Sequence, residues 1–306
     1  MILEGLLARA VQMSTPLLLG SLGEVIVERT GVMNMAIEGI FLLGAWAGFT
    51  GAYITGSLAA GFLCAMAAGV AVGALYGWIT VCLKQHQIVT GVAINILAAG
   101  IGIFFYRVLF GVPLLPLTVE PLRPLAVPFL SDIPVIGPAL FRQNILTYLA
   151  WGAMPLGWWV LFRTRTGLVL RSTGANPEAV DAAGISVERV RFGAVLAAGA
   201  LSGLAGAFYS IGYLGLFSND MIGGRGWIAF ALCFLGNWNP LGALLGAVVF
   251  GIADAAAITL QTSGIRMVPN EFLIALPYML TIAATLARKR FNVPASLGTA
   301  YIKEEK

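Results

Sequence analysis

One long uncharged run limits what this chain can fold into. Residues 39–83, GIFLLGAWAGFTGAYITGSLAAGFLCAMAAGVAVGALYGWITVCL, contain no charged side chain. Roughly 20 apolar residues in a helix cross the hydrocarbon core of a bilayer, so this run predicts two spans joined near Gly56 and Ser57. Only 10% of the whole chain is charged and 59% is hydrophobic, whereas soluble domains carry about 25% charged residues. We therefore predict an integral membrane protein with an all-α fold.

Apolar segments between charged or Pro/Gly-rich breaks predict the rest of the bundle. The expected spans are 8–28, 32–55, 58–83, 88–110, 144–162, 191–215, 241–260 and 270–287. Residues 226–236 are apolar but too short to cross a bilayer alone, which indicates a broken or re-entrant helix. Residues 1–306 are thus expected to form one polytopic helical domain with about 8–9 transmembrane segments.

The positions of arginine and lysine predict orientation, because these residues are enriched in cytoplasmic loops. They border the middle polar segment and fill the tail: Arg163, Arg165, Arg171, Arg189, Arg191, Arg288, Lys289, Arg290, Lys303 and Lys306. Segment 164–190 and tail 288–306 are therefore expected in the cytoplasm. The proline-rich residues 112–143 are expected to form an ordered loop outside, on the side of the N-terminus. Residues 23–39 either form a simple turn between two spans or fold back on themselves instead. The net charge of +4 gives no indication of a nucleic acid partner.

The polar stretch GANPEAVDAAGI has every signal of a short helix. Asn176 is a strong N-cap and Pro177 suits the first helical position. Glu178 and Asp181 favour the positive end of the helix dipole, and Gly184 can adopt the left-handed conformation that ends a helix. Isolated helices below about 12–15 residues are marginal in water. This helix must therefore pack against something.

Three interpretations compete for this helix: an ordinary loop helix, a helix on the lipid surface, and a helix that docks on a partner protein. The face with Ala179, Ala182 and Ala183 lacks the large apolar and basic residues of a lipid-surface helix. Small residues suit close packing against protein. The residues alone leave the loop helix and the docking helix open.

Four stretches together resemble a known family. They are GEVIVERTGVMNMAIEGIFLLGAWAGF, QIVTGVAINILAAGIGIFFYRVLFG, GLVLRSTGANPEAVDAAGISVERVRFGAVLAAGALSGLAGA and GRGWIAFALCFLGNWNPLGALLGAVVFGIADA, and they cover most of residues 20–300. The chain resembles the permease subunit of ATP-binding-cassette (ABC) importers of the branched-chain amino acid, ribose and nucleoside group, most closely the nucleoside or simple-sugar permeases. The resemblance implies a non-catalytic transport subunit for a small polar solute, with nucleosides expected first and ribose-like sugars as the alternative.

The resemblance also implies partners and a location. These are an ABC ATPase subunit that binds ATP, a second related permease subunit, an external solute-binding (lipo)protein and the lipid bilayer of a bacterial or archaeal cell membrane. The chain itself is expected to bind no cofactor. The middle loop supplies the coupling helix in this family, which implies that role for Asn176, Pro177, Glu178, Ala179, Asp181, Ala182, Ala183 and Gly184. The family pattern is Glu-Ala-Ala followed by glycine, whereas EAVDAAG spaces these residues differently.

Polar residues inside a membrane are candidates for a solute path or for hydrogen bonds between helices. Asn34 and Glu38 are four residues apart and are expected on one helical face, and Asn95 lies near mid-span. Both roles stay open for all three. Glu24 and Glu28 lie near a span end beside Arg29 and are expected to be solvated or to snorkel to the membrane surface.

Two glycine-interrupted segments, ERTGVMNMAIEG and NDMIGGRGWIAFALCFLGNWN, occur in the two halves of the chain. Broken helices in transporters expose backbone groups at the substrate site, so these segments predict a central path between them. Trp227 and Phe230 either stack on a nucleobase or sugar, or sit at the membrane interface.

Other function classes are less compatible with the sequence. There is no G-x-x-x-x-G-K-[ST], so this chain is not expected to hydrolyse ATP, and Cys64, Cys82 and Cys233 lack metal-ligand spacing. A stand-alone proton-coupled carrier would use Glu38 or Asp254.

An intramembrane enzyme would need Ser202 as nucleophile. The only histidine, His86, lies at a span end, which does not favour a catalytic pair.

Overall fold

The computed structural model describes residues 2–134, 136–262 and 291–303, together with residues 279, 282 and 286. Its elements are α1 (Ile2–Glu28), α2 (Ile37–Thr55), α3 (Leu58–Gly77), the π-helical turn η1 (Trp78–Cys82), α4 (Gln87–Phe110), β1 (Leu125–Ala126), α5 (Ile136–Leu140), β2 (Arg142–Gln143), α6 (Ile145–Arg163), α7 (Arg165–Ala175), α8 (Pro177–Ala182), α9 (Val187–Ala207), the π-helical turn η2 (Phe208–Leu214), α10 (Arg225–Leu235) and α11 (Pro240–Thr262).

The predicted polytopic helical bundle is confirmed. Within the described residues, 7 helices are long and apolar enough to cross a membrane, and α10 is a shorter apolar helix. The predicted span 270–287 lies outside the described residues.

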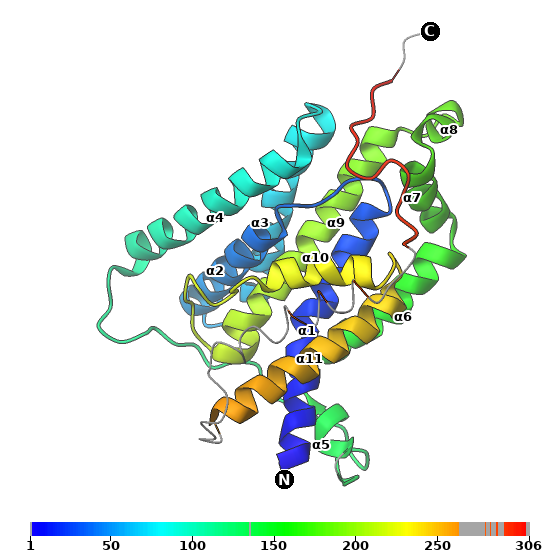
Figure 1. Ribbon diagram of the computed structural model, residues 1–306. Helices are drawn as coiled ribbons and strands as arrows, with labels where there is room; N and C mark the ends of the chain where they lie inside the picture. The colour runs from blue at the N-terminus through cyan, green and yellow to red at the C-terminus, as the bar shows by residue number, and fades with distance from the viewer. Residues whose placement is uncertain are drawn as a thin grey trace.

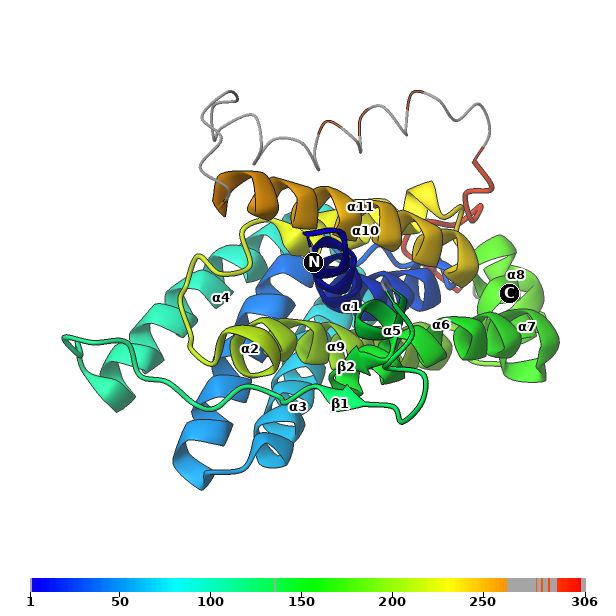
Figure 2. The ribbon, with the colours of Figure 1, turned by 90° about the horizontal axis from the view of Figure 1, so that it is seen from below.

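The bundle is built around α1, which lies between α11 and α9 (Figure 2). Helices α2 and α3 pack on α9, and α4 lies beside α2 (Figure 1). One end carries α7, α8 and the last described residues, and we name it the α8 end. The opposite end carries the N-terminus, α5 and the loop that follows α4, and we name it the loop end (Figure 1).

Small residues let the central helices cross closely. A Cβ atom on Gly69 of α3 would overlap the carbonyl oxygen of Gly199 in α9, and one on Gly206 would overlap the carbonyl oxygen of Phe41 in α2. Lipid tails are as apolar as side chains, so such close packing stabilises a membrane bundle more than burial does. Gly206 lies in the stretch LSGLAGA, whose glycines thus serve helix packing.

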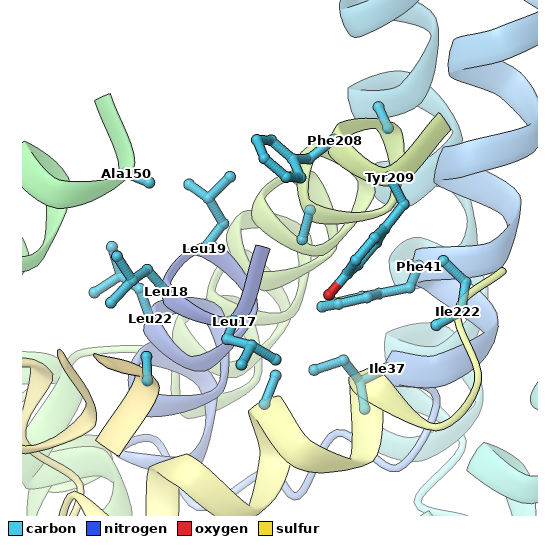
Figure 3. Close-up of a cluster of buried hydrophobic side chains, with 14 of the residues drawn as sticks. Leu17, Leu18, Leu19, Leu22, Ile37, Phe41, Ala150, Phe208, Tyr209 and Ile222 are labelled. Atoms are coloured by element: carbon cyan, nitrogen blue, oxygen red, sulfur yellow. The ribbon is translucent and has the colours of Figure 1, made fainter. Parts of the chain in front are cut away.

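The apolar core lies where α1, α2 and η2 meet. Leu17 of α1 points toward Phe41 and Ile37 of α2, and Tyr209 of η2 lies over Phe41, whereas Leu18 points to the other side of α1 (Figure 3). This packing fixes α2 and η2 against the central helix, and thereby positions the two ends of α2 that are described below.

Several predicted boundaries were wrong. The span expected at 32–55 begins at Ile37, because α1 ends at Glu28 and residues 29–36 form a non-helical segment. Gly31 in this segment has a φ of 92°, a left-handed conformation that glycine adopts without strain. Asn34 therefore does not share a helical face with Glu38. Helix α7 was not foreseen.

The proline-rich segment at the loop end forms no long helix, as its composition predicts. Strands β1 and β2 pair antiparallel, and the N–H groups of Val119 and Leu122 donate to the carbonyls of Gly215 and Ile211 at the end of η2. A pocket of about 610 Å³ lies between this segment and the end of α2, and Tyr53 lines it.

Candidate functional site

Helix α8 has the capped geometry that the sequence predicts. The Oδ1 atom of Asn176 accepts the N–H of Ala179 at 3.0 Å, Pro177 occupies the first turn, and Gly184 has a φ of 79°. Val180 is buried and holds the helix on its neighbours. The predicted short helix is confirmed.

The remaining face of α8 points away from the bundle at the α8 end (Figure 1). Exposed residues of the proposed coupling set are Asn176, Glu178, Ala179, Ala182, Ala183 and Gly184, and Pro177 and Asp181 are half-buried. A Cβ atom added to Gly184 would meet no atom within 4 Å. The structure thus gathers these residues on one accessible surface.

Residues 291–303, which we name the C-terminal strap, lie against α8 and the turn after α1. The N–H of Ser296 donates to the carbonyl of Gly174 at 2.9 Å, and the N–H of Gly298 donates to the carbonyl of Gly31 at 3.0 Å. Lys303 Nζ lies 3.0 Å from the Asp181 carboxylate. The hydrogen bond and the charge of Asp181 raise the pKa of Lys303 above its ordinary value.

Arg191 joins the strap to the bundle. Its guanidinium donates to the carbonyl of Thr30 at 3.0 Å, to the carbonyl of Thr299 at 2.8 Å and to Ser296 Oγ at 3.0 Å. The side chain is only 2% exposed. The sequence marked Arg191 only as an indicator of orientation, because its partners lie more than 100 residues away.

Glu38 joins the two interrupted segments. Its carboxylate accepts the N–H groups of Gly224 and Gly226, both at 2.8 Å. Gly224 is the N-cap of α10 and offers no side chain for capping. A carboxylate at a helix N-terminus satisfies orphan N–H groups and favours the positive end of the dipole. Glu38 therefore caps α10 from another helix.

Asn95 caps α2 in the same way. Its Oδ1 atom accepts the N–H of Gly39 at 2.8 Å, and its Nδ2 donates to the carbonyl of Met35 at 2.9 Å. Ala36, the N-cap of α2, makes no side-chain cap. Both ends of the Asn95 amide thus bind backbone, which is the arrangement expected for a link between helices.

Glu24 and Glu28 are both 0% exposed, so the prediction that they are solvated was wrong. Asn34 Nδ2 donates to Glu24 Oε1 at 2.7 Å, and the indole N–H of Trp238 donates to Glu28 Oε2 at 2.5 Å. Segments 29–36 and 236–239 cover this end of α1, which the local sequence does not reveal. Arg29 instead donates to the carbonyl of Trp238 at 2.8 Å.

Trp227 and Phe230 lie half-buried along α10. Their ring centroids are 6.3 Å apart, and Phe230 is 5.0 Å from Phe234. The structure places Trp227 directly after Gly226, beside the Glu38 contact, and Phe230 further along the helix. Asp254 lies 3.6 Å from the Arg225 guanidinium.

The described residues contain no group of three or more His, Cys, Asp or Glu that could hold a metal ion. Ser202 is 0% exposed, whereas His86 is exposed and caps α4 by accepting the N–H of Val89. The serine–histidine pair of a hydrolase is therefore not formed by these two residues.

Comparison with known proteins identifies the family. Residues 6–285 match the family described as "Branched-chain amino acid transport system / permease component". The chain belongs to this permease family.

Relatives match the permease over nearly its whole length. The nucleoside ABC transporter permease protein NupC of Lactococcus lactis is 37% identical over 99% of this chain and 98% of its own. The guanosine ABC transporter permease protein NupQ of Bacillus subtilis is 35% identical over 95% of this chain and 94% of its own. A Haloferax volcanii protein assigned by its name to glucose ABC transport is 34% identical, over 98% of each chain.

A solved structure shares the fold of the permease. It is an inward-facing ABC transporter described as being of the metal-chelate type, with a TM-score of 0.52 and 16% identity, covering 94% of this chain and 87% of the other.

Proposed function

We propose that this permease carries nucleosides through the cell membrane as the membrane subunit of an ABC importer, with ATP hydrolysed by a partner subunit. The observation that carries this proposal is α8, a short, capped helix with an exposed alanine face at the end of the bundle. Two relatives that match over 95% or more of this chain are named for nucleoside or guanosine transport, which supports the choice of solute.

The proposed coupling route begins at α8, which seats in the ATPase subunit. Asp181 contacts Lys303 of the strap, and the strap reaches Arg191 through Ser296 and Thr299. Arg191 in turn binds the carbonyl of Thr30. Movement of α8 would therefore reach segment 29–36, which leads directly into α2.

The proposed solute path follows the junction between segment 29–36 and the start of α10. Glu38 and Asn95 hold the two helix starts there, and Asn34, Trp227 and Phe230 complete the set assigned to the path. A second related permease subunit would close the path, and an external solute-binding protein would deliver the solute.

The orientation belongs to the same proposal: segment 164–190 and the tail in the cytoplasm, and residues 112–143 outside. Ala183→Cys and Leu114→Cys test it in a variant without the three native cysteines, because both positions are exposed. We expect an impermeant maleimide to label position 114 only from outside and position 183 only from inside. Labelling of position 183 from outside would contradict both the orientation and the docking helix.

Two variants test the coupling role of α8. Gly184→Val introduces a β-branched residue at a positive φ, and Asp181→Arg reverses the charge that faces Lys303. We expect both variants to fold and insert into the membrane, but to lose ATPase co-purification or solute-stimulated ATP hydrolysis in vesicles. Gly193→Ala in α9 is the control, since a Cβ atom there meets nothing within 4 Å. Values equal to those of the control in both variants would rule out docking through α8.

The solute is tested with the unaltered permease and its partner subunits. We expect vesicles to accumulate radiolabelled adenosine or guanosine when ATP is supplied. Uptake of glucose or ribose without uptake of nucleosides would favour the alternative function, transport of simple sugars. The name of the Haloferax volcanii relative supports that alternative.

A further inference from the structure

An aromatic cluster lies between α2, α4 and the segment that follows η2. Ring contacts join five of its residues, which are Phe49, Tyr53, Tyr106, Phe110 and Phe217. Trp46 and Phe105 form a separate ring pair on the same two helices. The ring centroids of Trp46 and Phe105 are 5.9 Å apart, and those of Tyr106 and Phe217 are 5.5 Å apart. No residue of the cluster carries a charge, so its chemistry suits a neutral molecule with a flat face.

Three buried polar atoms beside these rings have no hydrogen-bond partner among the residues that the structure describes. They are the indole nitrogen of Trp46, the hydroxyl oxygen of Thr50 and the Oδ1 atom of Asn219. Thr50 is 9% exposed. An unpaired polar group in an apolar interior is destabilising by about 1–3 kcal/mol or more. Three such groups in one place indicate a site whose ligand supplies the missing partners.

The three atoms border the same group of rings. Trp46 and Thr50 are one helical turn apart on α2. A Cβ atom on Gly102 of α4 would lie 3.2 Å from Asn219 Oδ1, which places the Asn219 amide against α4 one turn before Phe105. The indole nitrogen is a donor, the amide oxygen is an acceptor, and the hydroxyl can be either.

The cluster continues into the pocket at the loop end. Tyr53 lines that pocket of about 610 Å³, and the Tyr53 and Phe49 rings stack with centroids 5.8 Å apart. Ligand sites for small molecules have volumes of about 300–1,000 Å³, so the pocket is large enough to admit a nucleoside. Tyr53 is the residue that the pocket and the aromatic cluster share.

We propose that this cluster is the nucleobase-binding subsite of the permease, an inference that rests on the proposed nucleoside transport. The base stacks on the Trp46 ring, the indole N–H donates to an acceptor on the edge of the base, and Asn219 Oδ1 accepts an N–H of the base. Phe105, which is 42% exposed, moves outward to make room.

The proportion of aromatic rings to polar atoms in the cluster favours a nucleobase over a sugar as the bound group. A monosaccharide presents several hydroxyl groups, each needing a partner once buried, whereas the cluster offers three buried unpaired polar atoms and two tyrosine hydroxyls among seven rings. A nucleobase has a large apolar face and a polar edge. Stacking of one base on an aromatic side chain contributes about 1–3 kcal/mol.

Binding is tested first with the purified full-length permease in detergent. Adenosine is titrated while tryptophan fluorescence is recorded, since a stacked base quenches the indole. We expect saturable quenching that Trp46→Phe abolishes. Trp151→Phe is the matched control, because the Trp151 indole nitrogen is also buried without a partner among the described residues but lies on α6, outside the cluster. Quenching that survives Trp46→Phe, or that Trp151→Phe removes instead, would overturn the assignment.

Transport then separates base recognition from general damage. Per assembled complex in vesicles, we expect Trp46→Leu to raise the adenosine concentration for half-maximal uptake about 10–100-fold. Trp46→Phe keeps a ring but loses the N–H, so it should raise the half-maximal adenosine concentration by a smaller factor. This variant also serves as the test if Trp46→Leu assembles poorly.

Four transport results would decide against the subsite. An unchanged half-maximal concentration in Trp46→Leu refutes base stacking. Equal losses of adenosine and ribose uptake refute base selectivity. Normal adenosine uptake in Asn219→Leu refutes the acceptor role of Asn219. If the unaltered complex imports no nucleoside, the proposed function is refuted. The subsite proposal rests on that function and is then refuted as well, without any variant.

Discussion

Glu38→Gln tests whether the carboxylate of Glu38 holds the start of α10. In the structure its two oxygens accept the N–H groups of Gly224 and Gly226, both at 2.8 Å. A glutamine keeps one carbonyl oxygen, but its NH₂ group would face the second N–H. One hydrogen bond is therefore lost, and the other no longer involves a charged acceptor.

The size of the effect follows from these two changes. A hydrogen bond to a charged group contributes about 1.5–3 kcal/mol, against about 0.5–1.5 kcal/mol for a neutral pair. A negative charge at a helix N-terminus adds about 0.3–1 kcal/mol. We expect Glu38→Gln to lower the free energy of unfolding by about 2–4 kcal/mol.

Unfolding in detergent, followed by circular dichroism during titration with a denaturing detergent, measures the change. Glu120→Gln is the control, because Glu120 pairs with Arg123 at 2.7 Å on an exposed surface and such pairs contribute about 1 kcal/mol at most. Equal stabilities for the two variants would refute the capping role of Glu38.

Three further predictions concern helix packing, the strap and the start of α2. Gly199→Ala should destabilise the bundle by about 1–3 kcal/mol through overlap with α3, whereas Gly193→Ala in the same helix should be neutral; thermal unfolding in detergent compares them. The pKa of Lys303 is raised by Asp181, so their contact should be intact at neutral pH and, on the alkaline side, should be lost as the pH rises beyond the ordinary lysine value of 10.5. NMR titration of ¹³C-methylated lysines should show this, with a lower midpoint in Asp181→Asn. Asn95→Leu removes the cap of α2 and should lower the free energy of unfolding by about 1–3 kcal/mol, measured in the same unfolding assay; an unchanged stability would show that the cap contributes little.

Local signals in the sequence were sufficient to predict α8. Asn176, Pro177 and Gly184 each act within a few residues, through a side-chain cap, a fixed φ and a left-handed φ. The spans were also predictable, because a bilayer imposes hydrophobic length directly on the sequence. Errors at their ends arose where a glycine turn, as at Gly31, interrupts an otherwise apolar run.

The partners of polar side chains were not predictable from local sequence. Glu38 binds a backbone 186 residues away, and Arg191 binds one 161 residues away. From local sequence, Glu28 is expected to be a solvated residue at a span end. In the fold it accepts the indole N–H of Trp238, which lies 210 residues later. Local sequence shows that a charged group is present, but only the tertiary fold shows whether protein or water surrounds it.

The position of α1 has a consequence for how the protein is made. It precedes the other described helices in the chain, yet its neighbours α9, α10 and α11 are synthesised much later. At about 5–20 residues per second, Trp238 follows Glu28 after roughly 10–40 s. During that interval the carboxylate of Glu28 lacks the indole N–H that it accepts in the fold, and lipid does not tolerate such a group well. We therefore expect α1 to stay shielded from lipid until α10 and Trp238 have been made.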